Sequence, residues 1–354
     1  MQTDFLIIGQ GLAGSLLAWE LVQRGCNVVV VDTGKENASL VAAGIVNPIM
    51  GMRFVKVADA ETLLPTAHVC YAQLSAFFQQ HFYCGKPMLR IFRAETELAY
   101  CKKRQKQVEY APYLGEFSTS DHPITQFSTS YGFIEQRQTG HLLTMPLLSQ
   151  LKQFFSERNA YRQTTLDYQA IQLDSVVHWQ DITAKQVVFC EGYQASQNPW
   201  FSWLPLQPAK GEILTLANEA LIPNVILNYG NWLLPGGSGK IRVGATFDRE
   251  HIDTQPSELG KQTLLNALKP YSPHLAQSKI VAHHAGIRPC TPDRFPFIGK
   301  HPNCGQIAIF NGFGAKGSLQ IPWYSQRFAD TLLHNAPLPS SCDIQRYQAT
   351  HFPG

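Results

Sequence analysis

Three glycines near the start of the chain have the spacing of a site that holds a dinucleotide. Gly9, Gly11 and Gly14 stand in the run G-Q-G-L-A-G. Gly9 suits a tight turn, Gly11 has no side chain to keep a pyrophosphate from the backbone, and Gly14 lets a helix pack on the preceding strand. Asp32 follows about twenty residues later, where an acid can accept hydrogen bonds from a ribose.

The elements around these glycines agree with such a site. Residues 5–8 and 28–31 are apolar and are predicted to be strands, and residues 16–21 between them read as a helix. The amino end of that helix offers free N–H groups and a positive dipole to phosphates. The alternative is a tight strand-to-helix turn that holds no ligand.

Size and composition exclude several other classes. The 354 residues suffice for two domains, and the formal net charge of +3 does not favour a nucleic-acid or anionic-membrane partner. No apolar run reaches the length that a bilayer requires. The eight cysteines form no C-x-x-C pair and have no zinc spacing. We therefore expect reduced thiols, no metal and a cytoplasmic location.

The pattern along the chain predicts an α/β protein with a discontinuous first domain. We expect helices at residues 59–82, 145–157, 257–267 and 322–334, strands at 140–144 and 185–190, and a β-rich stretch over 207–250. The basic run at 102–106 reads as the solvated face of a helix, with tRNA contact as the alternative. The predicted nucleotide domain comprises 1–80, 137–206 and 280–354, and the predicted substrate domain comprises 81–136 and 207–279.

Several separated motifs together resemble the D-amino-acid oxidase family of FAD-dependent oxidoreductases, its glycine oxidase-like members in particular. Their order and spacing cover nearly the whole chain. The motifs are G-Q-G-L-A-G at 9–14 with Asp32, A-A-G-I at 42–45, K-G-E-I-L at 210–214, V-G-A-T at 243–246, G-I-R-P-C-T-P-D at 286–293, P-F-I-G at 296–299 and N-G-F-G-A-K-G at 311–317.

The resemblance implies a Rossmann-like FAD-binding domain and a mostly antiparallel sheet that covers the flavin ring. The implied reaction is oxidation of the C–N bond of an amino acid or secondary amine, with hydride transfer from the α-carbon to flavin N5. The implied partner is a small amine or amino acid. The electron acceptor and the oligomeric state stay open.

The resemblance also implies which residues bind FAD. Small residues after Asp32 let a flat ring approach the backbone. Backbone N–H groups of the glycine loop at 311–317 are expected near the edge of the flavin that gains negative charge on reduction. Where some relatives carry a cysteine that binds FAD covalently, this chain has Gly286, so we expect noncovalent FAD. The expected FAD-binding residues are Gly9, Gly11, Leu12, Ala13, Gly14, Asp32, Thr33, Ser39, Ala42, Ala43, Gly44, Ile45, Gly192, Gly312, Phe313, Gly314, Ala315, Lys316 and Gly317.

Arg288 occupies the position of the family's substrate-carboxylate arginine in G-I-R-P. A guanidinium fork binds a planar carboxylate through two hydrogen bonds and so orients the substrate. The alternative is a structural ion pair. The resemblance assigns no general base.

The expected pocket departs from the family pattern at two positions. Trp232 stands where glycine oxidase-like sequences carry a tyrosine, and it is either a pocket wall or a core aromatic. Tyr229 is a candidate substitute hydroxyl. Phe247 and Ile45 either line the space over the ring or belong to the core. Gly236 replaces a common arginine, which removes one cation.

Three further side chains have two readings each. His283 and His284 titrate near neutrality and can carry protons, but aromatic residues at these positions in relatives favour packing. Lys316 either faces the flavin or is solvated.

Two other functions remain open at this point. A flavin-dependent tRNA-modifying oxidoreductase of the carboxymethylaminomethyl-uridine type would need a basic channel, which the near-neutral charge does not favour. A non-catalytic FAD-binding protein is suggested by the altered pocket with Trp232 and Gly236.

Overall fold

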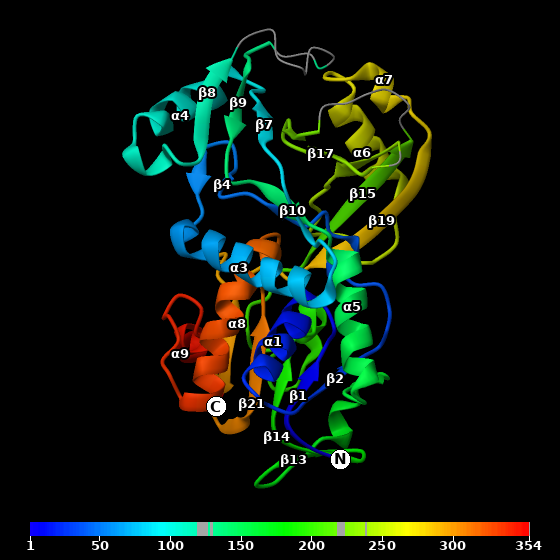
Figure 1. The fold of residues 1–354 in the computed structure, drawn as a ribbon, viewed down its shortest axis with the longest axis vertical. Helices are drawn as coiled ribbons and strands as arrows, with labels where there is room; N and C mark the ends of the chain where they lie inside the picture. Colours follow the sequence, from blue (N-terminus) through cyan, green and yellow to red (C-terminus); the bar gives the residue numbers. More distant parts are fainter. Residues whose placement is uncertain (119–126, 128–129, 218–223, 238, 354) are drawn as a thin grey trace. The chain divides into compact units, whose positions relative to one another are not determined.

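Residues 1–42, 144–209 and 287–354 fold into one unit, called unit 1 here, and residues 43–143 and 210–286 fold into unit 2. The computed structural model describes residues 1–118, 127, 130–217, 224–237 and 239–353 (Figure 1). The predicted division placed residues 43–80 in the nucleotide domain, whereas strand pairing ties this segment to unit 2. Strand β3 (Ile45–Val46) pairs with β10 (Gly140–Leu142), which also pairs with β6 (Tyr83–Gly85).

The sheet of unit 1 is parallel at its centre, as a Rossmann-like domain requires. Strand β1 lies between β2 and β14 and is parallel to both, and β11 and β21 extend the sheet in parallel. The run Val28–Val31 is fully buried, as expected for a strand covered on both faces. The strands are β1 Gln2–Ile8, β2 Val28–Asp32, β11 Tyr161–Gln163, β12 Gln172–Leu173, β13 Val177–Trp179, β14 Ile182–Phe189, β20 Phe297–His301 and β21 Cys304–Asn311.

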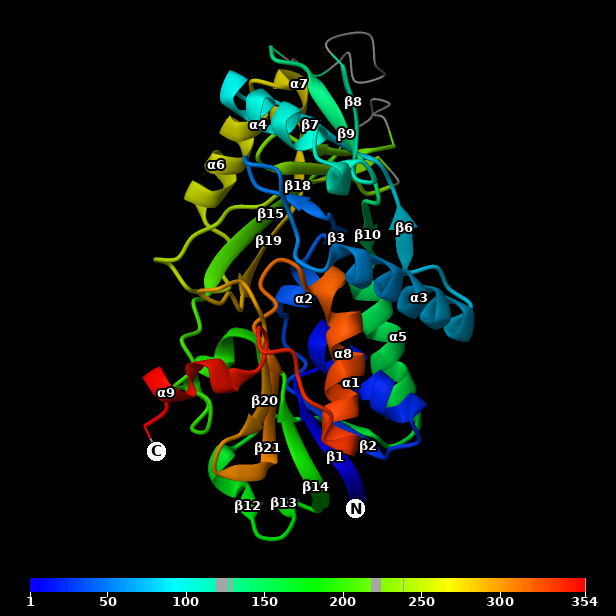
Figure 2. The same ribbon diagram turned by 90° about the vertical axis from the view of Figure 1, so that its left-hand side faces the viewer.

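Helices α1 (Leu12–Gln23), α5 (Thr144–Glu157) and α8 (Gly317–His334) lie on one side of this sheet (Figure 2). Trp19 of α1 packs edge-on against Phe154 of α5, with ring centroids 5.3 Å apart. Arg24 beyond the end of α1 forms an ion pair of 2.5 Å with Asp330 of α8. These contacts fix the helix that follows the glycine turn. The short helices of this unit are α2 Ala38–Val41 and α9 Gln348–His351.

Helix α8 begins five residues earlier than predicted. The predicted helix began at Pro322, but this proline lies inside the helix, which starts at Gly317. A proline one turn further in leaves one carbonyl without its helical donor. The consequence for the site is that the glycine loop runs directly into the helix.

The main sheet of unit 2 is mostly antiparallel, as the resemblance implied. Its order is β19-β15-β18-β17-β16-β7-β9-β8, and the pair β16–β7 is parallel. The strands are β7 Met88–Ile91, β8 Leu114–Ser118, β9 Phe133–Gln136, β15 Ala209–Ala217, β16 Ile226–Asn228, β17 Trp232–Pro235, β18 Lys240–Gly244 and β19 Ile280–Arg288.

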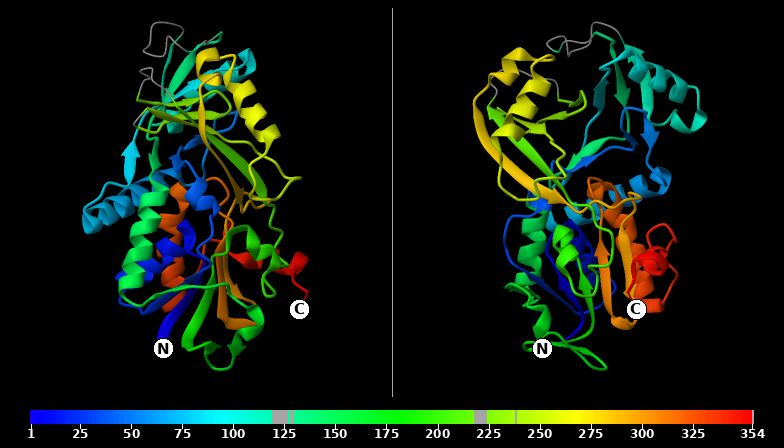
Figure 3. Two further views of the ribbon diagram at one scale, coloured as in Figure 1. Left: turned by 90° about the vertical axis from the view of Figure 1, so that its right-hand side faces the viewer. Right: turned by 180° about the vertical axis from the view of Figure 1, so that it is seen from behind.

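The two faces of this sheet pack differently. Helices α6 (Glu258–Leu268) and α7 (Pro273–Ala276) cover one face, where Leu264 and Leu268 join a large apolar cluster with Leu214, Leu233 and Val243 (Figure 3). The opposite face carries a smaller cluster, which consists of Ala43, Met88, Ile226 and Leu234 with Ile45 and Trp232 packed against it. We call this second surface the open face of the sheet.

The remaining elements of unit 2 include one helix that the periodicity predicted and one that it missed. Helix α3 (Ala60–Phe78) matches the predicted helix at 59–82. Helix α4 (Glu95–Gln105) is absent from the predicted helices, although the basic run at 102–106 had indicated a helical surface. The periodicity missed α4 because its buried side has too few apolar residues to give a helical pattern. The pair β4 (Ile49–Met50) and β5 (Val55–Lys56) forms a small hairpin.

Candidate active site

The turn between β1 and α1 has the shape that the three glycines predicted. Gly9 has φ +103°, which residues with a side chain rarely adopt. A Cβ on Gly14 would lie 1.9 Å from the carbonyl oxygen of Gly9, so only glycine allows helix and strand to approach this closely. The first turn of α1 begins at Leu12, and its leading N–H groups have no helical acceptor.

Asp32 and Ser39 hold this turn in place. The Asp32 carboxylate accepts hydrogen bonds from the N–H of Gln10 at 2.8 Å and of Gly34 at 2.6 Å. The Ser39 hydroxyl accepts the N–H of Leu12 at 3.0 Å. Each Asp32 oxygen keeps further lone pairs, so the same carboxylate can also accept from ribose hydroxyls. Gln10 was not predicted as a site residue, because a backbone donor leaves no signal in the sequence.

A second glycine loop joins the end of β21 to the start of α8. The Asn311 amide donates to the carbonyl of Gly192 at 2.7 Å and accepts the N–H of Gly312 at 2.8 Å. Gly314 has φ +53°, and its N–H donates to the carbonyl of Pro289 at 3.0 Å. The structure therefore brings together the predicted residues of the 312–317 loop and Gly192.

Lys316 of this loop is partly buried, and its ammonium group lies 3.5 Å from the carbonyl of Arg294. Burial, with a smaller contribution from the Arg294 charge, lowers the pKa of Lys316. A fully solvated side chain, the alternative weighed for Lys316, does not fit this placement.

Sequence reasoning missed Glu191, which follows β14 at the carboxyl edge of the parallel sheet. Its carboxylate accepts hydrogen bonds from the Tyr168 hydroxyl at 2.7 Å and the Asn198 amide at 2.8 Å. Burial raises the pKa of Glu191 to about 7, against the opposing effect of these two donors. The only available signal was an acid directly after an apolar strand, in the run F-C-E-G.

The residues of unit 1 fit a flavin dinucleotide. Gly9 and Gly14 have no side chains, so the turn can approach the dinucleotide closely. The first turn of α1 supplies N–H donors for the pyrophosphate. Asp32, at the end of β2, can accept hydrogen bonds from the ribose. FAD, when bound, supplies the redox chemistry, because no side chain of this chain accepts a hydride.

Arg288 is the last residue of β19 and follows the buried residues Ala285–Ile287. Burial lowers the pKa of its guanidinium, with a smaller opposing contribution from Cys290. A desolvated guanidinium interacts strongly with an anion, because the local dielectric is low. The placement suits the predicted role of Arg288 as a carboxylate clamp, which stays a prediction.

Trp232 lies on the open face of the unit 2 sheet. Its ring crosses the neighbouring strand so closely that a Cβ on Gly244 would lie 2.5 Å from Trp232 Cζ2. Ala43 and Ile45, two of the predicted FAD-contacting residues, pack in the same cluster. The structure thus brings Trp232 together with the A-A-G-I segment.

Tyr229 and Phe247 do not join Trp232. Tyr229 packs in the cluster beneath α6 and α7, with its ring 5.1 Å from that of Tyr271, so it lies on the opposite face of the sheet from Trp232. This placement corrects the expectation of a pocket hydroxyl. Phe247 is 59% exposed, which excludes a core role, and the Arg249 guanidinium lies 5.5 Å from its ring centroid.

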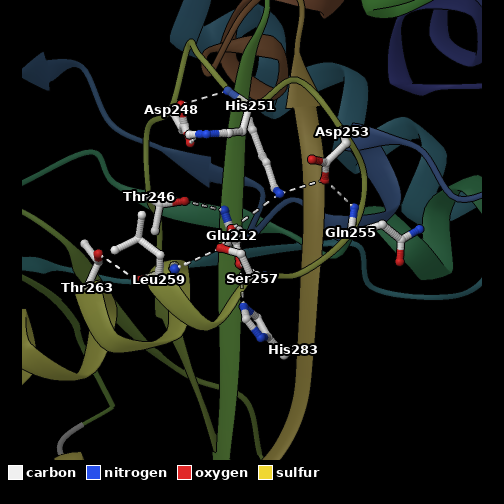
Figure 4. A network of polar contacts seen from close by, with 12 residues as sticks. Glu212, Thr246, Asp248, His251, Asp253, Gln255, Ser257, Leu259, Thr263 and His283 are labelled. Carbon is white, nitrogen blue, oxygen red and sulfur yellow. Dashed lines mark hydrogen bonds and ion pairs between the residues drawn. The ribbon is translucent and has the colours of Figure 1, made fainter.

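His283 belongs to a polar network on β15 and β19 (Figure 4). Its Nε2 lies 2.7 Å from the buried Glu212 carboxylate, which also accepts from the N–H and hydroxyl of Ser257 at 2.8 and 2.7 Å. Ser257 caps α6, and Lys210 bonds to Asp253 at 2.7 Å. The geometry supports a structural role for His283, whereas His284 is exposed.

The described residues contain no group of three or more His, Cys, Asp or Glu side chains arranged for a metal ion. Of the helices described, none combines the length and the apolar character that crossing a membrane needs.

A glycine turn between parallel strands, an acid after the second strand and a second unit with an antiparallel sheet define a two-domain, nucleotide-dependent oxidoreductase. The comparison with known families agrees, because the DAO family, described as FAD dependent oxidoreductase, matches residues 4–331. The chain belongs to this family, and FAD is its cofactor.

Individual relatives share modest sequence identity with this chain. The glycine oxidase of Pseudomonas aeruginosa is 23% identical, with 96% of this chain and 97% of that protein covered. The tRNA 5-methylaminomethyl-2-thiouridine biosynthesis bifunctional protein MnmC of Marinobacter nauticus is 24% identical over 92% of this chain, which covers 55% of that protein.

Solved structures confirm the fold. The glycine oxidase of Bacillus cereus superposes with a TM-score of 0.80 at 21% identity, covering 95% of this chain and 96% of that one. The iminodiacetate oxidase of Chelativorans sp. BNC1 gives a TM-score of 0.79 at 20% identity, with coverages of 96% and 98%.

Proposed function

We propose that this protein oxidises the C–N bond of an amino acid or a secondary amine that carries a carboxylate, with noncovalently bound FAD as the oxidant. The observation that carries the proposal is the partly buried Arg288 at the end of β19, in a chain of the DAO family. Glycine oxidases and an iminodiacetate oxidase among the similar proteins support this substrate class.

The contribution of the protein to the reaction is mainly positional. Arg288 holds the substrate carboxylate and so fixes the direction of the α-carbon–hydrogen bond. The C–H bond breaks with its electron pair going to FAD, the neutral amine nitrogen forms the C=N bond and loses a proton to water, and water hydrolyses the imine to a carbonyl compound and an amine. No side chain is assigned as general base.

The test is a substrate panel on the FAD-loaded protein under anaerobic conditions. Glycine, sarcosine, D- and L-amino acids and N-alkyl amino acids are mixed with the protein, and bleaching of the flavin absorbance is followed. We expect at least one carboxylate-bearing amine to bleach the flavin, and the same amine without its carboxylate to fail. A panel in which no amine bleaches bound FAD contradicts the proposal.

A second candidate follows from the similarity to the Marinobacter nauticus protein, whose name refers to tRNA modification. The substrate would then be a secondary amine on an RNA base, and basic surface would be needed to hold the phosphates. A filter-binding assay at low salt distinguishes the two: retention of tRNA supports the second candidate, and its absence removes it.

The compartment and electron acceptor belong to the same proposal. All eight cysteines lie in the described part of the chain and none is in a disulfide, which fits a reducing cytoplasm. Repeating the panel with oxygen alone and with an artificial dye tells an oxidase from a dehydrogenase.

A further inference from the structure

Glu191 is a titratable residue of unit 1 that the proposed reaction does not use. It follows β14, which pairs in parallel with β1 on one side and with β21 on the other. The carboxyl ends of these three strands therefore lie side by side, and ligands of open parallel sheets bind outside such ends. Residues 190–192 accordingly lie between the glycine turn after β1 and the glycine loop after β21.

Both glycine segments contact the short run 190–192. On the β1 side, a Cβ on Gly9 would lie 2.5 Å from the carbonyl oxygen of Cys190, so the two backbones touch. On the β21 side, the carbonyl of Gly192 accepts the Asn311 amide at 2.7 Å. Glu191 stands between these two contacts, so the charge of its side chain acts close to the turn that fits the pyrophosphate.

The Glu191 carboxyl group lies beside aromatic side chains and has no cation as a partner. Its two oxygens bond to the Tyr168 hydroxyl and the Asn198 amide. The Tyr168 ring centroid is 6.2 Å from that of Phe189 and 6.1 Å from that of Trp200. Within the described part of the chain, no Lys, Arg or His forms an ion pair with Glu191. Such surroundings favour the neutral, protonated acid over the carboxylate.

The titratable groups that interact with Glu191 are Tyr168 and Cys190, and both are neutral at neutral pH. Burial, with a smaller contribution from the Glu191 charge, raises the pKa of each. Asp167 is exposed, and its carboxylate caps the short helix that starts at Tyr168. The segment 198–201 has no ionisable side chain. A change in the protonation of Glu191 therefore changes the charge at this edge of the sheet.

A protonated Glu191 keeps both of its hydrogen bonds. Its O–H can donate to the Tyr168 hydroxyl oxygen, while its carbonyl oxygen still accepts from the Asn198 amide. An ionised Glu191 would instead place a negative charge near a pyrophosphate that is itself negative. Like charges repel most strongly where little water screens them.

We propose that FAD binding to unit 1 is coupled to a proton on Glu191, so that the protonated side chain permits tight binding and its ionisation weakens it. By linkage, bound FAD makes Glu191 hold its proton more tightly, and FAD affinity falls as pH rises through the range where the free protein loses this proton. The inference concerns loading of the cofactor and does not depend on which amine is oxidised.

The test measures the Kd for FAD at pH 6 and at pH 8.5. The FAD-loaded full chain is diluted to equilibrium, and the fluorescence of released FAD gives the Kd. The variant Glu191→Gln has the hydrogen-bonding groups of the protonated acid and cannot ionise. The matched control is Glu157→Gln, because Glu157 is an exposed acid of the same unit at the end of α5.

We expect the Kd of the unmodified protein to rise about fivefold or more between these pH values, as when binding raises the pKa of a single acid by about one. Glu157→Gln should show the same rise. Glu191→Gln should have the same Kd at both pH values, so at pH 8.5 it binds FAD more tightly than the unmodified protein. A Kd of the unmodified protein that does not change with pH overturns the inference, as does an undiminished rise in Glu191→Gln.

A second variant decides the matter where Glu191→Gln fails to fold. Tyr168→Phe removes a donor that favours the ionised carboxylate, so the pH at which FAD affinity falls should move upward. An unchanged pH dependence in Tyr168→Phe overturns the inference. These measurements use no substrate, so their failure leaves the proposed amine oxidation in place, and the absence of flavin bleaching by any amine leaves the proton coupling in place.

Discussion

Replacing Gly14 with alanine tests the nucleotide turn most sharply. The backbone at Gly14 needs no left-handed conformation, so the added methyl group is the whole perturbation. Its Cβ would lie 1.9 Å from the Gly9 carbonyl oxygen and 3.2 Å from Cys190 Cβ, whereas real Cβ atoms essentially never approach below 3.0 Å. Helix α1 must therefore move about 1 Å from the turn, because the carbonyl is backbone and cannot rotate away.

Overpacking of this kind costs about 1–3 kcal/mol of folding free energy. The movement also displaces the first-turn N–H groups of α1 from the pyrophosphate, so we expect FAD affinity to fall at least about tenfold, equivalent to about 1.4 kcal/mol. Urea unfolding of the apoprotein gives the first quantity. Quenching of FAD fluorescence on titration with apoprotein gives the second.

Gly305→Ala is the matched control, because Gly305 is exposed on β21 and a Cβ there meets no atom within 4 Å. This variant should keep both stability and FAD affinity. If Gly14→Ala binds FAD as tightly as Gly305→Ala does, the phosphates are not held by the turn and the reasoning fails.

Three further predictions follow from single side chains. Arg288→Lys should leave FAD affinity unchanged and lower kcat/KM for a carboxylate-bearing amine about a hundredfold, since an ammonium group cannot replace the two-pronged contact; unchanged kinetics would refute the clamp. Glu212→Gln should lower the free energy of unfolding by about 3 kcal/mol, because His283 loses its buried carboxylate partner. The control Glu258→Gln, at an exposed ion pair, should lower it by less than about 1 kcal/mol. Equal urea midpoints for these two variants would contradict the prediction. Glu191 keeps its proton in the folded state up to about pH 7 and loses it near pH 4.3 when unfolded, so its contribution to stability falls as pH rises between these values. The lowered pKa of His141 makes its own contribution to stability rise with pH, so the effect of Glu191 must be isolated by a variant. The urea midpoints of Glu191→Gln and of the unmodified protein are therefore compared at pH 5 and at pH 7. If the difference between the two midpoints is the same at both pH values, the assignment is refuted.

The first β-strand, glycine turn and helix were predictable because each depends on neighbouring residues. Gly9 and Gly14 determine the turn locally, and the apolar runs on either side fix the strands. The antiparallel unit was predictable only through the resemblance, because the pairing of β7 with β16 joins residues far apart in sequence.

The face of each side chain on the unit 2 sheet could not be read from the sequence. Tyr229 and Trp232 are separated by a turn in which the Tyr229 N–H bonds to the Asn231 carbonyl, and this turn puts them on opposite faces. Glu191 acquires its environment from Tyr168 and Asn198, which approach it only in the fold.

The central claim is that this chain passes a hydride from the α-carbon of an amine to bound FAD. The most direct measurement is anaerobic stopped-flow reduction of the FAD-loaded protein by an active amine, with hydrogen or deuterium on the α-carbon. The account predicts slower bleaching with deuterium and one carbonyl product for each FAD reduced. Two results would contradict the account. One is equal bleaching rates with hydrogen and deuterium in a reaction shown to be limited by flavin reduction. The other is bleaching of the flavin with no carbonyl product.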